Sequence, residues 1–144
     1  FGKTQLANME KRKSRSYIKE PDVIKDKLES GDMLAGSILY DTYCANCHQK
    51  DGKGDNNRFP PLAGSDWVIG DKTRLLGAIL NGLQGEIKVN GQKWDGLMPA
   101  HAGFLDDHAV ASIATYIRDN FGNKASVVTS SDVSIVRNSN NKKK

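Results

Sequence analysis

Both cysteines of this 144-residue chain lie in one short motif, Cys44-Ala45-Asn46-Cys47-His48. On a helical turn, residues three apart face the same way, so Cys44 and Cys47 can present their thiols to one edge of a planar group. Cys-x-x-Cys-His is the pattern of covalent haem attachment, in which the histidine that follows the thiols becomes an axial ligand of the iron. The motif therefore predicts haem c bound through Cys44 and Cys47, with His48 beneath the iron.

Three other interpretations compete for the same residues. A thioredoxin-like Cys-x-x-Cys needs a βαβ setting, and no strand is expected before Cys44. A structural zinc site needs four ligands; His48 could be one, but the chain has no third cysteine, and His101 and His108 are distant in sequence. The third alternative is a chance match between two ordinary cysteines. The rest of the chain has to decide among them.

The length corresponds to one domain, and only 38% of the residues are hydrophobic. A buried cofactor would supply apolar surface that the side chains lack. No run of about 18 apolar residues is present, so we expect no transmembrane segment. No secretory signal is visible, and because the first residue is Phe1 rather than Met we expect a processed chain whose N-terminus gives no information on localisation.

The net charge of +4 is unevenly distributed. Residues 1–30 carry eight Lys/Arg against five Asp/Glu, residues 31–121 carry eight against eleven, and residues 122–144 carry five against one. The central part is thus mildly acidic and both ends are basic. Because no basic face with interleaved aromatic residues is present, we expect the charged ends to be solvated and predict no binding of nucleic acid.

Helical periodicity and capping residues place three main helices, at about 32–46, 71–81 and 105–121. A small β-hairpin is expected at 86–94, because Asn90-Gly91 is a typical two-residue turn. The hairpin is too short to be stable alone, so it should be a flap on the domain. We expect a charged extension at 1–30, a domain at 31–122, and a C-terminal extension at 123–144 with a disordered basic tail.

The first helix contains Gly36, which costs about 1 kcal/mol relative to alanine in a helix interior. Such a glycine allows close approach by another helix, so we expect a later helix to cross at this position.

An electron-transfer haem needs a second axial ligand. Met98 precedes a proline in a loop long enough to cross the haem face, and His101, three residues on, is the serious rival. Three further candidates are weaker: Met33 lies on the helix of the haem motif, Met9 in the N-terminal extension and His108 within the third helix.

Taken together, several motifs make the sequence similar to the class I c-type cytochromes, especially bacterial cytochrome c domains that occur alone or fused to dehydrogenases, oxidases and nitrite reductases. The motifs are Gly36-x-x-x-Tyr40-x-x-x-Cys44-x-x-Cys47-His48, Pro60-Pro61-Leu62-Ala63-Gly64, Met98-Pro99-Ala100 and Tyr116-Ile117. The resemblance covers about residues 31–122. It implies an all-α cytochrome c fold, with three main helices around a covalently bound haem and a small β-hairpin flap.

The resemblance also implies roles for single residues. Gly36 and Tyr40 would cross the last helix against Ile113 and Tyr116. The Pro60 carbonyl, or alternatively that of Pro61, would accept a hydrogen bond from the ring of His48.

On the other side of the iron, Met98 would be the distal ligand. Trp94 would donate its indole N–H to a haem propionate, and Arg58 or Arg74 would offset propionate charge.

The function implied is that of a monohaem electron carrier, not an enzyme, either free or as a domain or subunit of a larger oxidoreductase. Its partners would be redox proteins, such as a dehydrogenase, oxidase or reductase, docking at the exposed haem edge near Cys44 and Cys47. Because the family's haem is attached outside the bacterial cytoplasm, the expected location is the periplasm or the outer face of a membrane. The alternative from another class is an enzyme or gas sensor in which the Met98 loop swings away.

Overall fold

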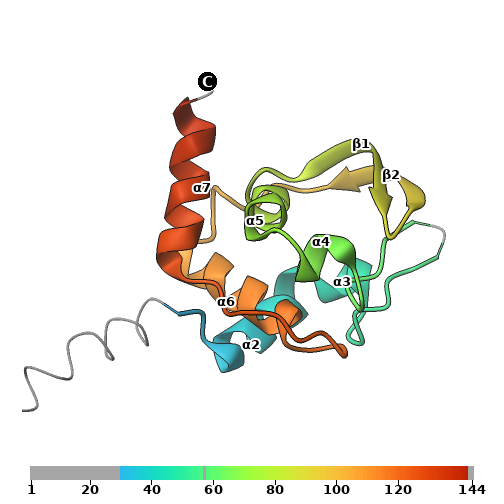
Figure 1. The fold of residues 1–144 in the computed structure, drawn as a ribbon, viewed down its shortest axis with the longest axis horizontal. Helices are drawn as coiled ribbons and strands as arrows, with labels where there is room; N and C mark the ends of the chain where they lie inside the picture. The colour runs from blue at the N-terminus through green and yellow to red at the C-terminus, as the bar shows by residue number, and fades with distance from the viewer. Residues whose placement is uncertain (1–29, 57, 143–144) are drawn as a thin grey trace, which may run out of the picture.

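The computed structural model describes residues 30–56 and 58–142. Four helices of ten or more residues carry the fold: α2 (Met33–Tyr43), α5 (Lys72–Asn81), α6 (Asp107–Arg118) and α7 (Ser130–Lys142). Two short helices, α3 (Ala45–His48) and α4 (Asp66–Ile69), and one antiparallel hairpin, β1 (Leu83–Val89) with β2 (Gln92–Met98), complete the described part. In Figure 1 the hairpin lies on the opposite side of α5 from α7. Of the extension expected at 1–30, residues 1–29 lie outside the described residues.

The three helices expected from sequence are present, and aspartates begin each of them. The side chain of Asp32 accepts hydrogen bonds from the backbone N–H groups of Leu34 and Ala35. Asp71 and Asp106 do the same for the second and third helices. Each such cap contributes about 1 kcal/mol to helix stability. The first helix is shorter than expected, because it ends at Tyr43 and the chain turns at Cys44 into α3.

Helices α2 and α6 cross at Gly36, as the glycine indicated. A Cβ atom at Gly36 would lie 2.1 Å from the carbonyl oxygen of Ser112, so no larger residue fits without moving a helix. Next to the crossing, the buried ring of Tyr40 packs edge-on against Tyr116 with 5.6 Å between centroids. The expected partner Tyr116 is thus confirmed, whereas the backbone of Ser112, rather than Ile113, makes the closest approach to Gly36.

The hairpin turns at Asn90-Gly91, as predicted, and both residues have positive φ. It is longer than the expected 86–94, because the strands pair from Val89 opposite Gln92 to Leu83 opposite Met98. Gly85 lies opposite Gly96 in the middle of the ladder. Because glycine is unfavourable in strands, these two glycines concealed the strand pattern beyond the predicted ends of the hairpin. The longer hairpin places Met98 at the end of a strand.

The hairpin tip is tied to the start of α4. Asn90 and Asp66 each donate a backbone N–H to the other's side-chain oxygen, at 3.0 and 2.9 Å. The indole of Trp67 donates to the carbonyl of Lys88 at 2.7 Å. These bonds hold the turn of the hairpin, at the end distant from Met98, against the start of α4.

In the C-terminal extension, residues 130–142 form α7, which packs on α5 and α6. The expectation of a disordered basic tail is therefore wrong for the Asn/Lys-rich end as far as Lys142, and residues 143–144 lie outside the described residues. Val133 and Val136 are buried in the core. Thr129 and Asp132 form a reciprocal pair of backbone-to-side-chain bonds at 3.0 and 3.1 Å. This is a capping box, in which two otherwise unpaired N–H groups at a helix start are satisfied. None of the described helices is long and apolar enough to cross a membrane.

Candidate functional site

The proximal half of the site is built by α3 and the proline segment. The ring of His48 is almost fully buried, and its Nδ1 atom lies 2.9 Å from the carbonyl oxygen of Pro60. Since a carbonyl only accepts, Nδ1 carries the hydrogen and donates it. The sequence left Pro60 and Pro61 open as this acceptor, and the geometry selects Pro60.

Glycine-rich backbone between His48 and the prolines makes this bond possible. Gly54 has a φ of +69°, and a Cβ atom there would lie 2.4 Å from the carbonyl oxygen of Phe59 and 2.7 Å from that of Pro60. Only glycine permits this approach. The loop therefore returns the chain close enough for Pro60 to meet the His48 ring.

Burial lowers the pKa of His48, and the hydrogen bond to Pro60 opposes that shift only in part. The ring is therefore neutral at neutral pH. With Nδ1 donating to Pro60, the lone pair of Nε2 is available to a metal.

Cys44 and Cys47 are free thiols, both half-buried and both on the wall of a cavity. Burial raises the pKa of Cys44 to about 12, and the neighbouring Cys47 adds to that rise. A thioredoxin-like thiol works through a lowered pKa. The environment of Cys44 therefore opposes the disulfide-exchange interpretation.

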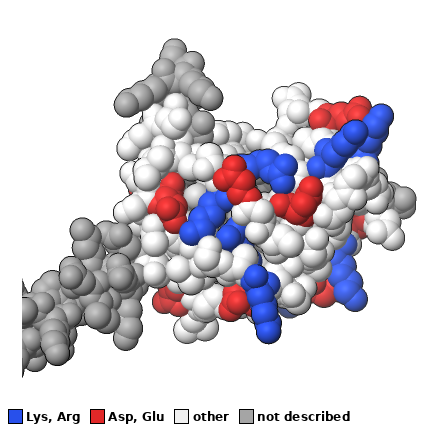
Figure 2. All heavy atoms as spheres, viewed as in Figure 1, with Lys and Arg blue, Asp and Glu red and all other residues white. Residues whose placement is uncertain are grey.

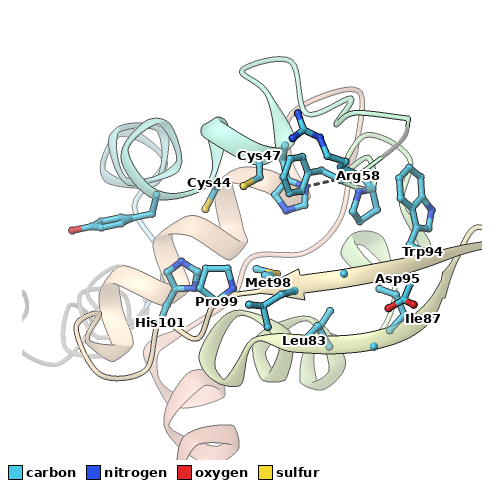
Figure 3. A pocket seen from close by; sticks show the side chains of 17 residues that line it. Cys44, Cys47, Arg58, Leu83, Ile87, Trp94, Asp95, Met98, Pro99 and His101 are labelled. Atoms are coloured by element: carbon cyan, nitrogen blue, oxygen red, sulfur yellow. Dashed lines mark hydrogen bonds between the residues drawn. The ribbon is translucent and has the colours of Figure 1, made fainter.

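Two adjoining cavities, of about 700 and 580 Å³, lie between α3, α5, α6 and the hairpin. Their walls are largely apolar, as the walls of cofactor sites usually are. The residues that line both are Cys44, His48, Pro60, Leu83, Ile87 and Met98. Figure 3 shows the two cysteines on one side of the larger cavity and Met98, Leu83 and Ile87 across from them.

The distal candidates Met98 and His101 both reach the cavities, but in different ways. Met98 lies at the end of β2 and lines both cavities, as His48 does. His101 lines the larger cavity alone, and its Nδ1 atom is 3.1 Å from the carbonyl oxygen of Ile79. Met33 and His108 line neither cavity, and Met9 lies outside the described residues.

Trp94 supplies a test of whether the residues present fit a haem. Its side chain is buried on the wall of the larger cavity, and among the described residues its indole Nε1 has no hydrogen-bond partner. A buried donor without an acceptor costs about 1–3 kcal/mol. An acceptor on a bound group, such as a haem propionate, would remove that cost, so the site fits the cofactor.

The two arginines considered from sequence differ in position. Arg58 lines the larger cavity and lies 3.5 Å from a carboxylate oxygen of Asp55. Arg74 lines neither cavity; its guanidinium instead stacks 4.3 Å above the ring of Trp67. Only Arg58 is therefore placed to meet a charged group at the cavity.

No group of three or more His, Cys, Asp or Glu side chains in the described ranges could hold a bare metal ion. The described residues therefore offer no ligand set for the structural zinc site considered from the sequence.

Sequence reasoning missed Leu83 and Ile87 as cavity residues. Their alternation along β1 was the available signal, but Gly85 between them concealed it.

Comparison with known proteins agrees with this geometry. Residues 31–117 match the family described as cytochrome c oxidase, cbb3-type, subunit III. Cytochrome c-552 of Thermus thermophilus is 39% identical over 96 residues, which are 64% of this chain and 72% of that protein. The cytochrome c subunit of a quinone-dependent alcohol dehydrogenase from Gluconobacter oxydans is 35% identical over 76% of this chain.

The cbb3-type oxidase subunit CcoP of Azospirillum is 31% identical over 67% of this chain. The match spans only 23% of the dehydrogenase subunit and 31% of CcoP.

Proposed function

The chain belongs to the class I c-type cytochromes, in the family described as cbb3-type oxidase subunit III, and from that membership we propose that His48 and Met98 are the two axial ligands of its haem. The protein is a monohaem cytochrome that transfers electrons, and the haem c is attached through Cys44 and Cys47. When bound, the haem supplies one-electron chemistry by alternating between ferric and ferrous iron. It is an electron-transfer protein rather than an enzyme in its own right.

The observation that carries the ligand assignment is the shared position of His48 and Met98, which line both cavities. His101 lines only one, and its backbone N–H and Nδ1 both point to carbonyl oxygens at the end of α5. The hydrogen bond that His48 donates to the carbonyl of Pro60 holds the histidine ring in one orientation and increases its basicity. Methionine and histidine together favour a higher reduction potential than two stronger donors would give.

The remaining residues orient the cofactor and exclude water. Leu83 and Ile87 of the hairpin present apolar side chains to the cavities. We assign the unpaired indole of Trp94 to a haem propionate, and the exposed guanidinium of Arg58 to the same charged edge.

The ligand assignment is tested by three variants of the haem-loaded protein. Met98→Ala should abolish the sulfur-to-iron charge-transfer band and open the iron to cyanide and carbon monoxide. Met33→Ala is the matched methionine control, since Met33 is exposed on α2, and His101→Asn tests the rival ligand. Absence of the band from the unsubstituted protein, or its retention in Met98→Ala, would refute the assignment. Rapid cyanide binding by the unsubstituted protein would instead favour a sensor or enzyme.

We further propose that redox partners dock at the cavity mouth beside Cys44 and Cys47. Tyr43, Leu97 and Pro99 line the cavity there and are exposed, and Phe104 packs against Tyr43 with 5.3 Å between ring centroids. On the face drawn in Figure 2, acidic and basic side chains are interspersed rather than gathered by sign. An apolar contact of small area suits a transient electron-transfer encounter.

The related dehydrogenase and oxidase subunits suggest partners of those classes. Gel filtration of a native extract, followed by haem absorbance, distinguishes a free carrier from a subunit. Elution near the mass of this chain alone, 15.8 kDa, would support a free carrier, and co-elution with a dehydrogenase or oxidase activity would support a subunit.

For location, we propose the periplasm or the outer face of a membrane. The basis is the family: in c-type cytochromes the haem is attached outside the cytoplasm, and both thiols must be reduced when the thioethers form. Release of the haem protein by osmotic shock or by washing of membranes would support this location, and recovery with the cytoplasmic fraction would contradict it.

A further inference from the structure

The loop that connects Met98 to α6 is held on one side by the end of α5. The backbone N–H of His101 donates to the carbonyls of Ile79 and Leu80, at 3.1 and 3.2 Å, and that of Ala102 donates to Leu80 at 3.0 Å. These bonds fix the first half of the loop. They leave the carbonyls of Ala102 and Leu105 to other donors.

Those two carbonyls are bound from the opposite side by Arg137 of α7. Its Nη1 donates to Ala102 at 2.7 Å, its Nη2 donates to Leu105 at 2.8 Å, and its Nε lies 2.8 Å from Oδ1 of Asp107. One planar guanidinium thus joins two loop carbonyls and the first residue of α6. A lysine could not do so, because its ammonium group lacks the rigid fork of donors.

The helix that carries Arg137 is itself fixed in place. Val133 and Val136 of the same helix are buried in the core, and the Thr129–Asp132 capping box sets where α7 begins. The arginine side chain is 25% exposed, so its bonds are partly shielded from water. Arg137 also lies outside residues 31–117, which match the family model.

We propose that Arg137 is a positioning residue for Met98, and that α7 is a brace that holds the distal loop closed over the cavity. The proposal rests on the ligand assignment made above. With Arg137 in place, the loop after Met98 is pinned between α5 and α7. Without it, the loop keeps its hydrogen bonds to the carbonyls of α5 but loses those to α7, so the loop opens more often and the sulfur leaves the iron more often.

The test compares Arg137→Gln and Arg137→Lys with the unsubstituted haem protein. Because opening of the loop precedes entry of an external ligand, cyanide binding should accelerate about tenfold or more in Arg137→Gln, as expected for loss of charge-assisted bonds. Arg137→Lys should accelerate less. The amides of Phe104 and Leu105, which donate to the carbonyl of His101, should exchange hydrogen faster in both variants.

Two controls separate the brace from a general loss of stability. Val128→Ala removes buried apolar volume at a residue that lines neither cavity, so it should lower stability without changing cyanide binding. Asn138→Ala changes an exposed neighbour on α7 and should change neither. Equal acceleration in Val128→Ala and Arg137→Gln would overturn the proposal.

The outcomes also distinguish this proposal from the ligand assignment. If Met98→Ala loses the charge-transfer band while Arg137→Gln binds cyanide at the unsubstituted rate, the assignment stands and the brace is refuted. If Met98→Ala keeps the band, the assignment falls and so does positioning of an iron ligand by Arg137. Unchanged hydrogen exchange of Phe104 and Leu105 in Arg137→Gln would refute the brace whatever the ligand.

Discussion

At the scale of single residues, the site depends on side chains whose polar atoms have one defined direction. His48 donates from Nδ1 to Pro60, which leaves Nε2 facing the cavity. Trp94 is the converse case, since its donor reaches the cavity wall and finds no acceptor among the described residues. Both arrangements fit a bound group that carries a metal and acceptor oxygens.

The indole of Trp94 gives the first prediction. In the haem-loaded Trp94→Phe variant, a propionate loses a hydrogen-bond donor, so its negative charge is less neutralised and ferric iron is favoured. The reduction potential should fall by about 20–60 mV, which is at most about a tenfold change in the one-electron equilibrium. Spectroelectrochemical titration measures it. Trp67→Phe is the control, because the ring of Trp67 also lines the smaller cavity but its indole N–H already donates to the carbonyl of Lys88. An equal shift in both variants would contradict the assignment.

At the scale of elements, the crossing of α2 and α6 decides where the haem motif is presented. The Cys44–His48 segment follows directly from α2, so any displacement of α2 at Gly36 moves both thiols and the histidine. The close approach of Gly36 to Ser112 therefore positions the haem motif through the backbone of α2, although Gly36 has no side chain that could contact the site.

Gly36→Ala should destabilise the protein by about 2 kcal/mol or more, because the added methyl group would lie 2.1 Å from the carbonyl oxygen of Ser112. Gly77→Ala is the matched control. Gly77 lies within α5 with nothing within 4 Å of the added atom, so its replacement should stabilise by about 0.5–1 kcal/mol. Guanidinium unfolding of both haem-loaded variants measures the difference. Equal effects would show that the crossing tolerates a Cβ atom.

Helix α7 gives a second prediction at this scale. Val133 is fully buried whereas Ile135 is exposed on the same helix. Val133→Ala should cost about 1.5–2.5 kcal/mol from the loss of two buried methyl groups and the cavity they leave. Ile135→Ala should change the unfolding free energy by less than about 0.5 kcal/mol. If Val133→Ala were as mild as Ile135→Ala, α7 would not be packed on α5 and α6 in solution.

At the scale of the whole molecule, the haem should be part of the core. The cavities of about 700 and 580 Å³ are lined by residues from α3, α5, α6 and the hairpin. These elements therefore meet around the cofactor as well as around one another. Only 38% of the residues in the chain are hydrophobic, so few further apolar side chains are available to fill that volume.

The double variant Cys44→Ala and Cys47→Ala, which cannot attach haem covalently, tests this. It should lose the near-ultraviolet circular dichroism of fixed aromatic packing and unfold over a broad range of temperature, while keeping part of its helical signal. The haem-loaded protein should unfold cooperatively. Cooperative unfolding of the double variant at the same midpoint would show that the protein side chains alone make the core.

The sequence by itself determined the chemistry, because the chemistry is local. Cys44, Cys47 and His48 lie within five positions of one another, and Pro60 and Met98 stand in short motifs from which the family resemblance implied their roles. The capping aspartates and the Asn90-Gly91 turn are equally local, which is why the helix starts and the hairpin turn agree with expectation.

What only the tertiary structure decided is set by contacts between distant segments. The choice of Ser112 at Gly36, the extension of the hairpin through Gly85 and Gly96, and the folding of 130–142 into α7 depend on burial that no short window encodes. Thr129-Ser130-Ser131-Asp132 was a readable capping box, but its polar context concealed it. The three bonds of Arg137 join residues about 30 positions apart, and only the folded chain brings them together.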